Sequence, residues 1–191
     1  MPGAFALLES FVSVPNQRFV CSLAGPYETD RHQTFHVVHY LRPPASADLL
    51  RDIQECPAAA QILDFYTHSD GGLLFRDPDS DGVGLELLKS SSWKLLGAAI
   101  RESFGDCEAE DRPDWLDHFL AFGEAGHSGN YFVLPTAGPQ AGTVIYVDHE
   151  GPLVNVWAPN FDVFIEQIRE DPAGQFYEMG CFLRFHKDNE G

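Results

Sequence analysis

Alternating apolar and polar positions predict a series of β-strands in the C-terminal half of the chain. Turns containing glycine or proline separate four such runs, near 118–123, 130–134, 143–148 and 153–157. The spacing then becomes helical, because Phe161, Phe164, Ile165 and Ile168 form one apolar stripe from about 160 to 169, with Asn160 as the N-cap. We therefore expect a β-meander that packs on this helix.

The N-terminal half gives shorter signals. Residues 1–33 are predicted to be irregular apart from one short strand, since proline and glycine interrupt their apolar pieces. Thr34 to Leu41 alternates as a strand does, and Ser46 is a suitable N-cap for a helix that follows it. Pro57 is placed to begin a second helix, for which Gly71–Gly72 would supply a left-handed stop.

The middle of the chain is predicted to contain one more strand and one more helix. Val83 to Leu88 is a short apolar run typical of a strand. The helix is expected from about Ser91 to Phe104, with Trp93, Leu96 and Ile100 on its buried stripe. Together these elements predict an α+β fold with one mainly antiparallel sheet and helices packed mostly on one face, in a single domain over residues 1–191.

Acidic residues dominate the charge of the chain. Twenty-nine Asp and Glu oppose twelve Lys and Arg, for a formal net charge of −17. This excess disfavours nucleic acid and anionic membranes as direct partners, because both would be repelled. It favours a basic protein as the partner, or serves solubility alone and keeps the chain a monomer or weak homodimer.

The acidic residues are concentrated in two places, which we take as candidate partner-binding sites. The first lies between Asp106 and Asp117, where Arg112 is the single cation, and the second lies between Asp77 and Glu86. The alternative is a solvated surface without a partner. The candidates in the first cluster are Asp106, Glu108, Glu110, Asp111, Asp114 and Asp117, and those in the second are Asp79 and Asp81.

No metal site or cofactor is expected. Asp77, Asp79, Asp81 and Gly82 match the first half of a calcium loop, but Leu88 stands at the twelfth position, where such a loop needs a bidentate Glu. A solvated turn accounts for the same residues. His36 and His39 would point to opposite faces of a strand and so would not share a zinc ion.

Candidate catalytic groups are few. Asp148 and His149 lie at a predicted turn between two strands, where an acid and base pair could serve a small hydrolase or a ligand-binding protein, although turns are often polar without any chemistry. The four cysteines form no close pair, which is typical of free thiols in a reducing compartment. The N-terminus has no basic region before its apolar run, so we expect a cytoplasmic protein.

Two segments carry a resemblance to a known family. Residues 57–72 read PAAAQILDFYTHSDGG, and residues 129–168 contain GNYFVL, IYVDHEG and NFDVFIEQI in that order. In this the chain resembles the SUKH superfamily, which includes fungal cell-wall assembly regulators and many bacterial immunity proteins. The resemblance covers about residues 55–170. Residues 1–45 form an N-terminal extension with one strand that matches poorly, and the acidic segment at 106–117 has no counterpart.

This resemblance implies a protein that binds another protein and catalyses no reaction. In bacteria the partner of such a protein is commonly a cognate toxin, often a nuclease. The charge of the chain agrees with this implication, because a nuclease presents cations that an anionic surface can attract and cover. The alternative that stays open is a regulator or scaffold without a toxin partner, and less favoured is the small hydrolase.

Overall fold

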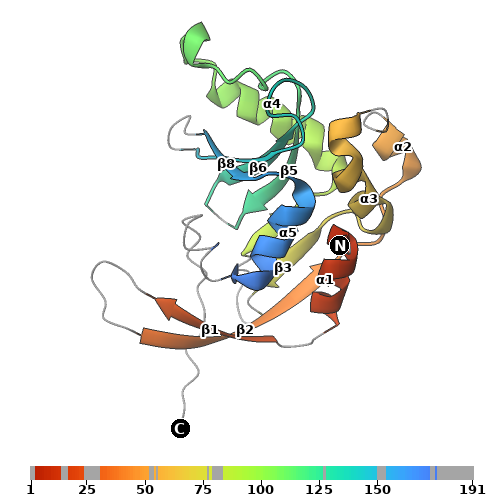
Figure 1. Cartoon of the computed structure of the whole chain (residues 1–191), viewed down its shortest axis with the longest axis vertical. Helices are drawn as coiled ribbons and strands as arrows, with labels where there is room; N and C mark the ends of the chain where they lie inside the picture. The colour runs from red at the N-terminus through yellow and green to blue at the C-terminus, as the bar shows by residue number, and fades with distance from the viewer. Residues whose placement is uncertain are drawn as a thin grey trace.

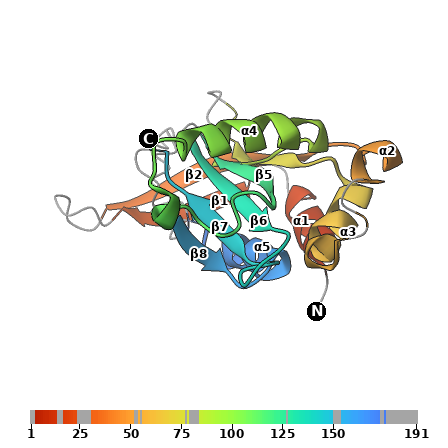
Figure 2. The same ribbon diagram turned by 90° about the horizontal axis from the view of Figure 1, so that it is seen from above.

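The computed structural model describes residues 3–13, 17–23, 31–51, 54, 56–76, 78, 84–126, 128–149, 154–172 and 175. These residues form one antiparallel sheet with helices on both sides (Figures 1 and 2). Within the described ranges, no helix has the length and apolar character needed to cross a membrane.

Helices lie between groups of strands along the chain. The helices are α1 (Ala4–Val12), α2 (Ala47–Leu50), η2 (Pro57–Ala59), α3 (Ala60–His68), η3 (Ser90–Ser92), α4 (Trp93–Ser103), η4 (Ala109–Asp111) and α5 (Phe161–Glu170). The strands are β1 (Gln17–Leu23), β2 (Arg31–Leu41), β3 (Gly72–Arg76), β4 (Leu85–Leu87), β5 (Phe119–Ala125), β6 (Asn130–Pro135), β7 (Val144–Val147) and β8 (Val154–Ala158).

The strands pair in their order along the chain, from β1 to β8, and every pairing is antiparallel. The long strand β2 has two partners: its first part, Arg31 to Val37, pairs with β1, and its last part pairs with β3. Figure 1 shows the β1–β2 hairpin extending sideways from the rest of the sheet. The predicted α+β class and antiparallel sheet are confirmed.

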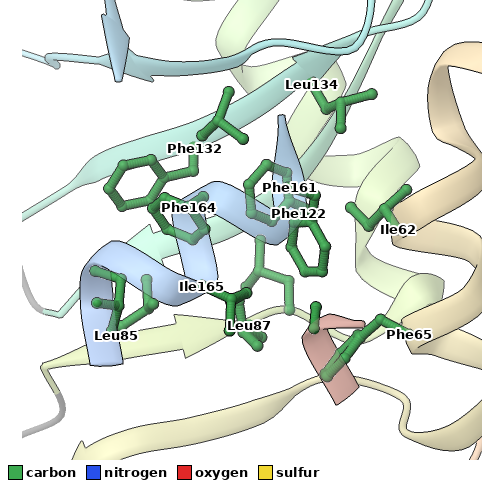
Figure 3. Close-up of a cluster of buried hydrophobic side chains, with 14 of the residues drawn as sticks. Ile62, Phe65, Leu85, Leu87, Phe122, Phe132, Leu134, Phe161, Phe164 and Ile165 are labelled. Carbon is green, nitrogen blue, oxygen red and sulfur yellow. The ribbon is translucent and has the colours of Figure 1, made fainter. Parts of the chain in front are cut away.

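The larger core lies on the face of the sheet that α1, α3 and α5 cover. Phe122 and Phe132 from the sheet meet Phe161 and Phe164 of α5, and all four side chains are fully buried (Figure 3). Helix α5 has the predicted stripe, and its Asn160 N-cap accepts a hydrogen bond from the Val163 amide at 2.9 Å. The assignment of Phe161 and Phe164 to the fold is therefore correct.

A second, smaller core lies on the opposite face. Side chains alternate along the central strands, so that Phe122 points to the first face while Phe119 and Ala121 point to the second. The second core also takes Ile100 and Phe104 from the end of α4, and Figure 2 shows α4 across the sheet from α5. Most helices thus share one face, as expected, and α4 adds a layer on the other.

The N-terminal segment contains a helix that the sequence pattern did not predict. Helix α1 buries Ala4, Leu7 and Leu8 in the larger core, where it packs on α5 and α3. The Ala4 amide donates a hydrogen bond to the Asp162 carboxylate of α5 at 3.0 Å, which satisfies one free donor at the start of α1. The prediction of irregular structure around one short strand is therefore wrong for α1, whereas β1 supplies the strand.

The end of α3 also differs from its prediction. The helix ends at His68, and the next residue, Ser69, already has extended backbone angles, so Gly71 is not the left-handed residue that stops it. Gly71 nevertheless has φ of +79°, and a Cβ atom there would lie 2.2 Å from the Leu87 carbonyl oxygen. Glycine is required at this position because the backbone at the end of β4 passes against it.

Candidate partner-binding surface

The first acidic cluster lies in the connection between α4 and β5, residues 104–118, which we call the acidic connection. Two aromatic side chains hold it against the second face of the sheet: Phe104 and Trp115 are 1% and 2% exposed, and their rings meet edge to face at 6.2 Å. Trp115 also contacts Phe119 of β5 at 5.3 Å between ring centroids. The inner side of the acidic connection is therefore part of the second core.

The outer side of the acidic connection carries the predicted carboxylates. All six are exposed, and in the described part of the chain none of them forms an ion pair or accepts a hydrogen bond through its side chain. They are Asp106, Glu108, Glu110, Asp111, Asp114 and Asp117. The structure thus brings these residues together on one solvent-facing segment.

The single cation of this segment does not neutralise them. The Arg112 guanidinium donates hydrogen bonds to two backbone carbonyls, Cys107 O at 3.1 Å through Nε and Gly105 O at 2.8 Å. These bonds tie the two ends of the η4 turn together. Arg112 therefore fixes the backbone that presents the carboxylates and pairs with none of them.

The second cluster cannot be placed in the same way. Asp77, Asp79, Asp81 and Gly82 lie outside the described residues. Leu88, at the last position of the calcium-loop pattern, is 8% exposed and belongs to the larger core, where its amide donates to Phe122 O. No group of three His, Cys, Asp or Glu side chains suited to a metal ion occurs among the described residues.

The glycine motif after α3 serves the fold. Ser69 donates through its hydroxyl to the carbonyls of Arg42 and Gly71, and the Asp70 carboxylate accepts from the Ser90 amide at 2.7 Å. These bonds join the segments that follow β2 and α3 to each other and to the start of η3. Nearby, the buried Tyr66 hydroxyl donates to Leu88 O at 2.5 Å, and burial raises the pKa of Tyr66.

One ion pair beside this motif was not anticipated. The strand register sets Glu86 of β4 directly opposite Glu124 of β5, an arrangement of like charges that costs free energy. Arg42 relieves it by donating to the Glu86 carboxylate at 2.6 Å, while its other terminal nitrogen donates to Leu87 O. Burial raises the pKa of the neighbouring Tyr131, and the negative charge of Glu124 raises it further. Only the folded structure could reveal the Arg42–Glu86 ion pair, because the two residues are far apart in the sequence.

The predicted acid and base pair lies beside a network of structural hydrogen bonds. His149 donates to the side-chain oxygen of Asn130 through its backbone amide at 3.0 Å and through Nδ1 at 2.6 Å. Asn130 is buried and donates in turn to the Tyr146 hydroxyl. The nearest approach of Asp148 to His149 Nδ1 is 3.8 Å, beyond the hydrogen-bond reach that a triad requires. The hydrolase hypothesis gains no support from this geometry.

A histidine in β2 has a different role from the metal ligation considered above. His39 lies at a bulge between Val38 and Tyr40, and its Nδ1 accepts a hydrogen bond from the Phe75 amide at 3.1 Å. Phe75 has φ of +56°, which is uncommon for a residue with a side chain. Burial lowers the pKa of His39 from 6.5 to about 4, so the ring is neutral at pH 7.

Two further side chains complete the comparison with the sequence. Trp157 is half-buried against the rings of Phe132 and Tyr146, and its Nε1 donates to Gln175. Leu95, which sequence reasoning passed over, is 78% exposed on α4. The signal that could have found it is an apolar residue outside the predicted buried stripe of Trp93, Leu96 and Ile100.

The fold and this surface define a class of protein: an α+β domain whose sheet is covered on both faces and whose prominent polar feature is an anchored, anionic connection. The model of the SMI1 / KNR4 family (SUKH-1) matches residues 59–167, more than half of the chain. The chain belongs to this family. No curated protein matches the chain significantly.

The matched region runs from the end of η2 into α5 and so includes most of the larger core, the second core and the acidic connection. Helix α1 and the β1–β2 hairpin precede it. The resemblance to the SUKH superfamily noted in the sequence is therefore confirmed.

Proposed function

We propose that this chain is a cytoplasmic immunity protein that catalyses no reaction and neutralises a basic toxin through the acidic connection. One observation carries the proposal: six exposed carboxylates stand on a segment whose inner side is anchored in a core and whose only cation is committed to backbone carbonyls. The residues of the binding surface are Asp106, Glu108, Glu110, Asp111, Asp114 and Asp117.

Electrostatics supports a basic partner. A concentrated group of like charges at a surface attracts an oppositely charged protein and speeds its association, with an effect that falls as salt is added. A nuclease toxin presents cationic side chains that bind phosphate, and the carboxylates of the acidic connection can bind those side chains in place of the substrate.

The anchoring of the acidic connection supports binding with little loss of conformational entropy. Trp115 fixes one end of the segment in the second core, and the Arg112 guanidinium holds the backbone of the other end. Ordering a loop on binding would cost free energy, so a loop that is already held in place binds more tightly for the same contacts.

The position of the carboxylates is unfavourable for folding, which also supports a role in binding. Glu102 lies in the last turn of α4 and Asp106 follows the helix by three residues, at the end where the helix dipole favours cations, and the neighbouring carboxylates repel one another. A surface without a binding role has no evident need for this arrangement.

Cytoplasmic location is part of the proposal and rests on cysteine chemistry. Cys56 and Cys107 are free thiols in the described part of the chain, as is usual in a reducing compartment. Asp79 and Asp81 remain second-choice contact residues. A regulator without a toxin would use the same acidic surface, and toxicity of the partner separates the two functions.

The test uses the tagged chain as bait in lysate of its native cells at low ionic strength, with elution by salt. We expect a basic protein that kills cells when expressed alone and spares them when this chain is co-expressed. A partner that is not toxic would favour the regulator, and a partner whose binding does not respond to salt would contradict the acidic-surface proposal.

A charge-matched pair of baits locates the binding surface. In one bait Asp106, Glu108, Glu110 and Asp111 are changed to Lys, and in the other Glu9, Asp48, Asp64 and Glu170 are changed to Lys. Both sets are exposed and both change the net charge equally, but the second set lies on α1, α2, α3 and α5. Only the first bait should lose the partner, and equal losses would show that total charge, not this surface, attracts it.

A further inference from the structure

Helix α4 presents an apolar stripe to solvent beside the acidic connection. Its buried side is formed by Trp93, Gly97 and Ile100. Leu95, Ala98 and Ala99 are exposed, and Leu95 is the most exposed of the large hydrophobic residues described, at 78%. At about 3.6 residues per turn, positions 95, 98, 99 and 102 fall on one side of a helix. Between the exposed Lys94 at its N-terminal end and Glu102 at its C-terminal end, the outward side of α4 is therefore apolar.

The charges around this stripe are arranged asymmetrically. Glu102 follows the stripe on the same side of α4, and the chain then continues directly into the acidic connection. Arg101, one residue earlier, is directed elsewhere: its Nε donates to Leu116 O at 3.2 Å and its guanidinium lies over the Phe119 ring at 5.0 Å. The C-terminal end of the stripe is thus bordered by carboxylates.

We propose that the outward side of α4 and the acidic connection form one docking surface for a basic amphipathic helix of the partner. This inference rests on the proposed function and adds the shape and the apolar component of what binds. The two alanines permit another helix to approach closely, since small residues let backbones come together. Leu95 packs against the apolar stripe of the incoming helix, and its Lys and Arg residues face Glu102 and the acidic connection.

This composition matches the general anatomy of protein interfaces. An apolar contact that is removed from water supplies much of the affinity, and a charged rim supplies orientation and association rate. A single exposed leucine is common on protein surfaces and means little alone. Here Leu95 begins an apolar stripe that ends at the carboxylates. Because these carboxylates are negatively charged, complementarity of charge identifies the occupant as basic.

The test uses two synthetic peptides as probes and the isotope-labelled full chain as the receptor. One peptide contains only leucine and lysine, with leucines at helical spacing, and the other keeps every lysine but has glutamine in place of leucine. Binding is followed by the change in amide chemical shifts. We expect the leucine peptide to bind more tightly and to shift the amides of 95–102 as well as those of 106–111.

Two variants of the chain complete the test. Leu95→Gln should weaken the leucine peptide by about tenfold or more, as expected for loss of one buried leucine contact, and should leave the glutamine peptide unaffected. Val156→Thr is the matched control, because Val156 is also exposed but lies on β8, three strands away from the strand under α4. Val156→Thr should leave the affinities for both peptides unchanged.

The outcomes separate this inference from the proposed function. If both peptides bind equally, or if Leu95→Gln has no effect, the apolar part of the docking surface is wrong, while salt-sensitive shifts in 106–111 still support an acidic binding surface. If neither peptide shifts the amides of 106–111, the inference fails, and the proposed role of the acidic connection fails with it.

Discussion

The two faces of the sheet are built from the same strands but differ in what lies outside them. On the first face, α1, α3 and α5 close a large core of aromatic and aliphatic side chains. On the second face, α4 and the acidic connection close a smaller core around Trp115 and Phe119. The outer side of that second layer carries the exposed leucine and the concentrated carboxylates.

This difference suggests a division of roles. The first face supplies most of the buried apolar area, which is the main source of folding free energy. The second face uses a smaller core to hold a segment whose charges oppose folding. Changes on the first face should therefore lower stability without altering recognition, and changes on the second should alter recognition.

The largest expected effect is on the first face. Phe122→Ala should lower the free energy of unfolding by about 4 kcal/mol, because Phe122 is fully buried among Phe132, Phe161 and Phe164. Urea denaturation measures this loss. The molecules that remain folded should bind the partner with unchanged affinity, and a weakened affinity would mean that the two faces are not independent.

A smaller loss of stability with a loss of binding is expected on the second face. Trp115→Ala should cost about 3 kcal/mol and should weaken partner binding, although it removes no charge. Trp115→Phe keeps a ring and removes an Nε1 donor that has no hydrogen-bond partner in the described structure, so it should cost less stability than the alanine variant and leave partner binding nearly unchanged. Normal binding by the alanine variant would show that the acidic connection does not need its anchor.

Lowering the pH should reduce the stability of the fold, because the buried His39 resists protonation in the folded chain. Its folded pKa of about 4 lies below the unfolded value of 6.5, so the unfolded chain takes up the proton first. The stability contribution is complete above pH 6.5 and is lost as pH falls to about 4, by about 3 kcal/mol at most. In His39→Asn, whose side-chain oxygen can accept from the Phe75 amide, denaturation midpoints between pH 4 and 6.5 should vary less. An unchanged pH profile would reject this role for His39.

The smallest effect tests the cost of the carboxylates. The double variant Asp106→Asn, Glu108→Gln should raise the free energy of unfolding by a few tenths of a kcal/mol at low ionic strength, since it removes charges that oppose each other and the α4 dipole. Thermal melting at low and high salt measures this gain, which should vanish at high salt. A loss of stability would show that these side chains make favourable contacts.

Much of the fold was predictable because its strongest signals are local. Strands β5 to β8 alternate apolar residues, and α5 combines a helical stripe with its own cap, Asn160. Helix α1 has apolar residues at helical spacing as well, but it carries no local cap. Its first donor is satisfied by Asp162, which lies 158 residues away, and no local pattern can predict such a contact.

The candidate surface was predictable in its polarity but not in its construction. The run of acids indicated an exposed segment, and all six residues are exposed. The attachment of Arg112 to backbone carbonyls and the opposition of Glu86 and Glu124 depend on loop geometry and strand register. The exposure of Leu95 depends on which side of α4 faces the sheet, and only the packed structure decides this.

The central claim is that the acidic connection is the partner-binding surface. The most direct measurement is a calorimetric titration of the isolated partner with three chains: the unchanged protein, the variant with Asp106, Glu108, Glu110 and Asp111 changed to Lys, and the control with Glu9, Asp48, Asp64 and Glu170 changed to Lys. Only the first variant should lose binding, by at least about a hundredfold, or roughly 3 kcal/mol. Equal affinity of the two variants for the partner would contradict the account.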